Sequence, residues 1–442
     1  MAMTLARVTS PKFRGAPITV ISDFILHLRS PSHTRDCHRT PHGLGINLHQ
    51  ANLSVYSRSQ KRMVTTRAAV HAATAVSAAA SATAGGYTLL SFTPLTAVLG
   101  GLLLGIATAG KLLSTGRVLG ISGAVKGLVT GDLAAWRFTF LLGMGLGSVA
   151  LAGLLPGAFE VLPQSFPIWR AALAGLLVGF GSALGNGCTS GHGICGSARL
   201  SPRSFAYTAT FMGAGMLTAT LTGSAAAIGV APLPAALAMP TAVEAQLAVT
   251  VAAGGVAAFA ALAAAQRLSS RADAAGPSRA EQQQQQQQSA GLELGAEALA
   301  GFIFALGLGL SGMTRPSKVA GFLTLGVPSW DASLPFVMGG AVVVAMIAFQ
   351  GVMRFRIMQK PLFCPRFQIP SSNLIDARLL AGGVLFGAGW GLAGMCPGPA
   401  LVAALTGDPH VLAYLGAMVA GMWAQGRLEA MGQQSPAKTA SS

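Results

Sequence analysis

Charge is scarce in this sequence, because only 10% of its 442 residues are Asp, Glu, Lys or Arg. Soluble globular domains carry about 25% charged residues, so this deficit argues against an ordinary water-soluble enzyme. Hydrophobic residues make up 52%, which excludes an intrinsically disordered chain. What remains is a polytopic helical membrane protein. That class tolerates the 57 glycines, since small residues let helices approach closely in lipid.

Acidic residues are the scarcest, with 13 against 29 Lys plus Arg, and their distribution is uneven. Residues 1–85 hold ten basic and only two acidic residues and are rich in Ser, Thr and Ala. This composition is typical of an organellar transit peptide, and the alternative is a disordered cytosolic tail. We therefore expect a plastid membrane first, a mitochondrial membrane second and the plasma membrane third. No basic patch is interleaved with aromatic residues, so no nucleic-acid partner is expected.

Apolar segments of membrane-spanning length, which is about 20 residues, occur about nine times. A linker at 266–293 contains seven consecutive Gln and divides them into a first membrane half at 86–265 and a second at 294–427. A tail follows at 428–442. We therefore predict an all-α integral membrane protein of about nine transmembrane helices. The segments lie near 94–113, 134–156, 168–185, 204–228, 242–265, 294–312, 332–353, 378–395 and 409–425.

An internal repeat places four small polar side chains at equivalent points. Four segments begin with a Gly-spaced helix and then run into a Gly-, Pro- or Ser-rich break; their first glycines are Gly101, Gly175, Gly301 and Gly383. Thirteen residues further on lie Ser114, Cys188, Thr314 and Cys396. Interrupted segments at corresponding positions of two halves point to the binding site of a transporter.

Basic residues suggest how the halves are oriented. They cluster at 111–137, 199–203, 267–279, 354–366 and 427, whereas 157–168 and 229–241 have none. Alternating nine spans through this pattern puts the basic clusters on one membrane face. The breaks near Ser114 and Cys188 then start from that face, and those near Thr314 and Cys396 start from the other. This predicts an inverted repeat with helices broken at mid-membrane.

The second break, residues 185–196, holds most of the polar candidates for binding an anion. Its side-chain donors are Asn186, Thr189, Ser190 and His192, and its thiols are Cys188 and Cys195. A neutral thiol is a weak donor, and weak binding at several sites lets a substrate both enter and leave. No Asp or Glu is evident near the breaks, which argues against a carboxylate proton relay. Trp390 is expected to be a packing or interfacial aromatic.

Six strings carry a resemblance to a known family: STGRVLGISG, GNGCTSGHGICG, RLSPRSFAYTATFM, GLSGMTRPSKVAGFL, WDASLPFVMGGA and GWGLAGMCPGPAL. They resemble the YeeE/YedE sulfur-transport family, the thiosulfate permeases. The chain is most similar to a two-component form whose halves, here joined, are separate proteins. The resemblance implies a transporter rather than an enzyme, with thiols at helix breaks that pass a sulfur-containing anion along. Carried over by motif position, Cys188 and Cys396 match the thiols of the second and fourth breaks.

The first break departs from the single-chain members of that family, which carry a Cys in this region, where this sequence has Ser114 and Ser122 and no Cys. A three-thiol relay therefore does not carry over intact. Thiosulfate is the favoured substrate, and sulfite, a sulfide species or another sulfur oxyanion stay open. The expected partners are such an anion and the lipid bilayer, and the sequence also permits a homo-oligomer.

The rival hypothesis is a metal-binding or persulfide-transferring membrane redox protein. Cys188, His192 and Cys195 have spacing compatible with soft-metal ligation, and Cys396 would be a fourth ligand. A persulfide on Cys188 or Cys396 is the covalent version of this hypothesis. No carboxylate accompanies these residues to orient the His ligand, so we expect no resident metal or cofactor.

Overall fold

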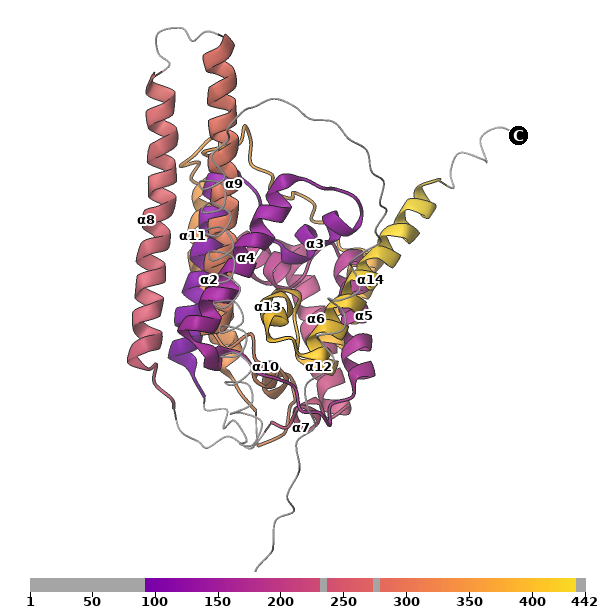
Figure 1. Ribbon diagram of the computed structural model, residues 1–442. Coiled ribbons are helices and arrows are strands. Elements are labelled where there is room, and N and C mark those ends of the chain that lie inside the picture. The colour runs from indigo at the N-terminus through magenta and orange to yellow at the C-terminus, as the bar shows by residue number, and fades with distance from the viewer. Residues whose placement is uncertain (1–91, 231–236, 273–278, 329, 435–442) are drawn as a thin grey trace, which may run out of the picture. The chain divides into compact units, whose positions relative to one another are not determined.

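Figure 1 shows the computed structural model of the chain, which describes all residues except 1–91, 231–236, 273–278, 329 and 435–442. Side chains are also not described for 269–285. The predicted transit segment at 1–85 therefore lies outside the described residues. Parts of the predicted linker and of the C-terminal tail lie outside them as well.

The described part of the chain is all-α, as predicted, and its only β pairings are isolated bridges. Nine of its helices have 17 or more residues, and shorter helices lie between several of them. The elements are α2 (Pro94–Thr115), α3 (Ile121–Val129), α4 (Ala135–Leu154), η1 (Pro156–Ala158), α5 (Ile168–Leu184), η2 (Thr189–Gly196), α6 (Pro202–Leu221), α7 (Ser224–Ile228), α8 (Ala242–Ala272), α9 (Arg279–Leu310), α10 (Pro316–Leu323), α11 (Ser333–Met353), α12 (Ala377–Ala393), α13 (Pro397–Ala403), η3 (Ala404–Thr406) and α14 (Pro409–Gln434).

Six helical segments among the described residues are long and apolar enough to cross a membrane, and a bent pair raises the number to seven. The bent pair is α5 with η2, which meet at 48°. The expectation of about nine spans is therefore met only in part. All nine expected segments contain a helix, but α6 carries five Ser or Thr residues after residue 203, and α14 ends in polar residues such as Gln425, Arg427 and Glu429. This polarity keeps both helices below the apolarity of a typical span.

Close backbone contact joins the long helices in pairs: α2 with α11, α4 with α9, α5 with α14 and α6 with α12. The repeated glycines explain three of these pairs. A Cβ atom on Gly101, Gly175 or Gly301 would lie 2.3, 2.1 or 2.1 Å from a carbonyl oxygen of the partner helix. Any larger residue would hold these backbones apart, so the glycines are required by helix packing. Two further contacts, α2 with α9 and α5 with α12, connect the pairs.

At each of the four predicted breaks, a long helix ends and a short helix follows. They lie between α2 and α3, α5 and η2, α9 and α10, and α12 and α13. We number them breaks 1 to 4. Gly116 and Gly394 end α2 and α12 in the left-handed conformation, with φ of 71° and 63°. Proline opens the short helices α10 and α13, where a missing N–H costs nothing.

Candidate functional site

Cys188 and Cys396 occupy the same structural position in two different breaks. Each is the extended residue that directly precedes a short helix, Cys188 before η2 and Cys396 before α13. The backbone carbonyl of Cys188 accepts from the His192 N–H at 2.9 Å, and that of Cys396 accepts from the Ala400 N–H at 3.0 Å. Their main chains are thus fixed by the following helix, while their thiols stand at the start of that helix.

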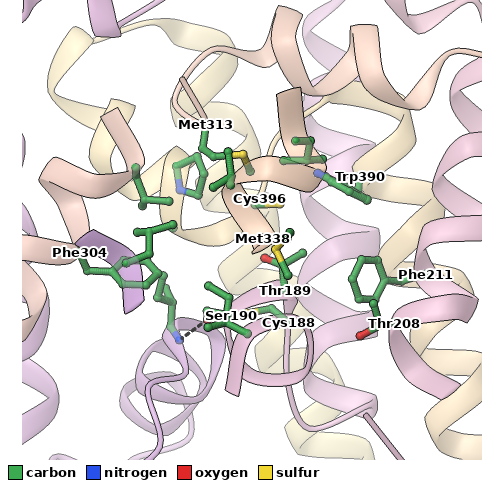
Figure 2. Close-up of a pocket in the computed structure, with 18 of the residues that line it drawn as sticks. Cys188, Thr189, Ser190, Thr208, Phe211, Phe304, Met313, Met338, Trp390 and Cys396 are labelled. Carbon is green, nitrogen blue, oxygen red and sulfur yellow. Dashed lines mark hydrogen bonds between the residues drawn. The ribbon is translucent and has the colours of Figure 1, made fainter. Parts of the chain in front are cut away.

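Both thiols face one cavity of about 50 Å³, which we call the thiol cavity. A cavity holds a water molecule from about 10–15 Å³ upward, so the thiol cavity has room for a small molecule. Figure 2 shows Cys396 and Met313 on one side of it and Cys188 and Ser190 on another. All four breaks contribute, through Ile121, Cys188, Met313 and Cys396.

Neutral groups form the wall of the thiol cavity. None of the described residues that line it carries a formal charge, and most are Leu, Ile, Val, Met or aromatic. Its polar groups are the two thiols, the indole N–H of Trp390 and the hydroxyls of Thr189, Ser190 and Thr208. A mainly apolar cavity with a few convergent polar groups is the usual form of a small-molecule site.

Hydroxyl groups link the thiols to the surrounding breaks. The Cys188 sulfur lies 3.3 Å from the Ser190 hydroxyl, which accepts from the Ile121 N–H of break 1 at 3.4 Å. Thr189 and Cys396 line the same cavity, so breaks 2 and 4 meet there. Four predicted site residues, Cys188, Thr189, Ser190 and Cys396, therefore come together in the structure.

Two other candidates from break 2 turn away from the thiol cavity. The Cys195 thiol is fully buried inside η2 and donates to the Leu119 carbonyl at 3.3 Å, so it joins break 2 to break 1. Asn186 is exposed, and its amide oxygen accepts from Lys126 at 3.4 Å. Neither residue lines the thiol cavity.

His192 is held by the protein on both sides of its ring. Nδ1 lies 3.1 Å from the Ser204 hydroxyl and Nε2 lies 3.2 Å from the Gly185 carbonyl. The ring also packs on Tyr207, with centroids 4.3 Å apart. Nδ1 thus fastens η2 to α6, and Nε2 fastens η2 to the end of α5. No three His, Cys, Asp or Glu residues gather as metal ligands within the described part of the chain.

Ser114 and Thr314, the equivalent residues of breaks 1 and 3, donate to main-chain carbonyls and do not line the thiol cavity. The Ser114 hydroxyl donates to the Gly110 carbonyl of its own helix at 2.6 Å. The Thr314 hydroxyl donates to the Ala158 carbonyl in the loop after α4. Thr314 lines a smaller cavity of about 10 Å³, which it shares with Met313 and Met395.

Carboxylates do lie near a break, so the expectation that none is present was wrong. Glu297 of α9 is fully buried and forms an ion pair with Lys111, in the last turns of α2 before break 1. Arg117 of break 1 pairs with Glu293 and Glu297, and Trp136 stacks against both cations. Sequence inspection missed this cluster because its acidic residues lie more than 170 positions from the bases they neutralise.

Trp390 and Thr208 are cavity residues that sequence reasoning missed. Trp390 was expected to be a packing aromatic, but it lines the thiol cavity together with Thr208 of α6. The sequence contains one signal for Trp390, because it lies in the fourth repeat six residues before Cys396.

Comparison with known proteins matches two separate regions of the chain. A family described as "Sulphur transport" matches residues 48–218, and a family of unknown function, DUF6691, matches residues 292–437. Two proteins of Xylella fastidiosa strain Temecula1, each described as "Probable transporter", match different parts of the chain. One is 44% identical over 123 residues, which are 28% of this chain and 81% of the relative. The other is 46% identical over 133 residues, which are 28% of this chain and 93% of the relative.

These relatives confirm the predicted resemblance and the joining of two proteins in one chain. With the membrane-spanning helices, they show an integral membrane protein of a transporter family, a class that is generally not enzymatic. The chain therefore belongs to the sulphur-transport (YeeE/YedE) family, in a form that carries on one polypeptide the regions that its relatives divide between two.

Proposed function

We propose that the chain is a permease for thiosulfate, which passes through the thiol cavity in contact with Cys188 and Cys396. The observation that carries this proposal is the meeting of two thiols from two different breaks in one uncharged cavity. Cysteine at the start of a short helix has its side chain free of the helix. A site built from such residues suits a soft, sulfur-containing ligand.

The chemistry of the cavity favours passage over retention. Thiol and hydroxyl donors make weak hydrogen bonds to an anion, while a fixed cation would bind it strongly. The basic residues nearest break 1, Lys111 and Arg117, are already paired with carboxylates. Lys318 after break 3 is likewise paired with Asp331 at 3.0 Å. The anion is therefore held by several weak contacts, which lets it both enter and leave.

Uptake of radiolabelled thiosulfate into cells that lack their own permease tests this function. We expect uptake by the wild type, and a loss of about tenfold or more in Cys188→Ala and in Cys396→Ala, because each removes one contact of a multi-site path. Cys364→Ala is the matched control, since Cys364 lies in the loop between α11 and α12 and outside the thiol cavity. The thiol-relay proposal fails if both cavity variants transport normally, and the permease proposal fails if the wild type carries no sulfur anion.

We further propose that residues 86–265 and 294–427 form two membrane halves related as an inverted repeat. The helix pairing supports this relation, because exchanging the halves turns the α2–α11 pair into α9–α4 and the α5–α14 pair into α12–α6. The contacts of α2 with α9 and of α5 with α12 are each unchanged by the same exchange.

We also propose an organellar membrane, with residues 1–85 as the targeting segment. The support is their composition, ten basic against two acidic residues. The sulphur-transport match begins at residue 48, inside this segment, so two lengths should be compared. Fluorescent fusions of residues 1–47 and 1–85 should both enter plastids if targeting precedes the matched region. A cytosolic or plasma-membrane signal from both fusions contradicts the proposal.

A further inference from the structure

Two polar groups on the wall of the thiol cavity have no hydrogen-bond partner within the described part of the chain. They are the indole N–H of Trp390 and the hydroxyl of Thr208. The Trp390 side chain is 1% exposed. Buried polar groups are nearly always hydrogen-bonded, and the requirement is stricter at membrane depth, where bulk water is excluded. Two unpartnered groups on one cavity therefore need an explanation.

Another tryptophan and another threonine, Trp330 and Thr210, do form hydrogen bonds within the protein. The Trp330 indole N–H donates to the Phe322 carbonyl at 3.0 Å. The Thr210 hydroxyl, on the same helix as Thr208, donates to the Ala206 carbonyl at 2.8 Å. Five buried side-chain atoms lack a partner within the described part of the chain, and the Trp390 N–H and the Thr208 hydroxyl are the two of them that line the thiol cavity.

The surrounding packing fixes Trp390 in this position. Its ring meets Phe211 edge to face, with centroids 5.6 Å apart. On another side it lies against Gly215, where an added Cβ atom would come within 3.1 Å of the ring. Figure 2 shows Trp390 on the same side of the cavity as Phe211 and Thr208, with Cys396 and Cys188 facing this wall.

We propose that the Trp390 N–H and the Thr208 hydroxyl bind the oxygen atoms of a sulfur oxyanion in the thiol cavity. The indole is a donor only, so its partner must be an acceptor, and an anionic oxygen accepts most strongly. The oxygens then face α6 and α12, which carry Thr208 and Trp390, and the terminal sulfur of thiosulfate faces Cys188 and Cys396. This inference rests on the proposed function and narrows its substrate to oxyanions, because hydrosulfide has no oxygen for these donors.

Competition of unlabelled anions against labelled thiosulfate uptake tests the donors. In Trp390→Phe, which keeps the aromatic contact with Phe211, we expect the KM for thiosulfate to rise about tenfold or more. Competition by sulfite should weaken as well, while competition by hydrosulfide stays at the wild-type level. Thr208→Val should raise the KM in the same direction.

The matched controls are Trp330→Phe and Thr210→Val, which remove donors that bond to the protein. Both should keep the wild-type KM. Unchanged thiosulfate KM in Trp390→Phe overturns the proposal and leaves a water molecule as the partner of the indole. The proposal is also overturned if competition by hydrosulfide weakens by the same factor as the KM for thiosulfate rises, because that result indicates a general loss of packing.

A binding readout separates this inference from the permease proposal. Purified protein is titrated with thiosulfate, sulfite and sulfate while tryptophan fluorescence is recorded. We expect a saturable change in the wild type that disappears in Trp390→Phe and persists in Trp330→Phe. If the wild type transports no thiosulfate, the permease proposal fails, but such a change still supports the oxyanion site. No Trp390-dependent change with any of the three anions overturns the inference, whether or not transport occurs.

Discussion

Position within a break decides what each cysteine can do. Cys188 and Cys396 each precede a short helix, and their thiols line the cavity. Cys195 lies inside η2, and its thiol donates a hydrogen bond to the Leu119 carbonyl. Repeat counting predicted the two cavity thiols because it finds the residue at which a helix ends. It could not exclude His192, whose partner Ser204 becomes a neighbour only when α6 folds against break 2.

Cys364 offers a test of thiol chemistry outside the membrane-spanning segments. It lies in the loop after α11 that covers break 1, where the Phe363 N–H donates to the Ser114 carbonyl at 2.9 Å. Burial raises the pKa of the Cys364 thiol to about 11, and the nearby carboxylate of Glu293 acts in the same direction. Because only the thiolate reacts, we expect maleimide labelling of Cys364 to rise about tenfold per pH unit from pH 7 to 10.

The measurement uses a variant in which Cys364 is the single remaining cysteine. The matched control places the reporter at Ser371→Cys, an exposed residue of the same loop. An exposed thiol has a pKa of about 8.5, so labelling of the control should level off above pH 9. If Cys364 levels off at the same pH as the control, its proposed burial in the loop is wrong.

At the scale of helices, glycine spacing determines which elements pack together. The repeat appears in the sequence as a pattern before each break, and in the structure three of its first glycines are points of backbone contact. Sequence alone could not say which helix each glycine faces, because the partner lies far away along the chain. The partner of Gly175, for example, is Tyr414 of α14.

Gly175→Ala should therefore weaken the pairing of α5 with α14. The new methyl group would lie 2.1 Å from the Tyr414 carbonyl oxygen, and backbone atoms cannot move aside as a flexible side chain can. We expect a loss of about 1–3 kcal/mol in the free energy of unfolding, the usual cost of overpacking. Gly145→Ala on α4 is the control, since no atom lies within 4 Å of its Cβ position.

Thermal unfolding of the detergent-purified variants measures both changes. The control should be unchanged or slightly stabilised, because alanine favours a helix by roughly 1 kcal/mol over glycine. A Gly175→Ala protein as stable as the control would show that the two helices are less closely packed than the structure indicates.

At the scale of the whole described unit, charged residues in loops and near helix ends make two sets of contacts, which we call two groups. In one group, Arg199 donates to the Pro370 carbonyl at 2.7 Å, and Lys126 and Arg378 both approach Glu429. In the other, Asp408 accepts from the Leu162 N–H at 2.9 Å and from His410. The basic clusters of the sequence contain Lys126 and Arg199 but neither Arg378 nor the acidic partner Glu429, because pairing depends on which segments the fold brings together.

These two groups give the inverted repeat a direct test. The loop before α5 and the loop before α12 are equivalent in the two halves, and they belong to different groups. Phe166 of the first loop accepts from His410 at 2.9 Å, whereas Leu374 of the second accepts from Arg203. In an inverted repeat equivalent loops lie on opposite membrane faces, while in a parallel repeat they share a face.

Ser165→Cys and Ser371→Cys, each introduced into a variant without the native cysteines, place one exposed reporter in each loop. A membrane-impermeant maleimide is applied to oriented vesicles before and after permeabilisation. We expect one reporter to react at once and the other only after permeabilisation. The loop before α12 should lie on the same membrane face as the basic clusters. This is the side from which the protein inserts, because loops rich in Lys and Arg stay on that side. If both reporters react in intact vesicles, the two loops share one membrane face. That result contradicts the inverted repeat and indicates a parallel repeat around the thiol cavity.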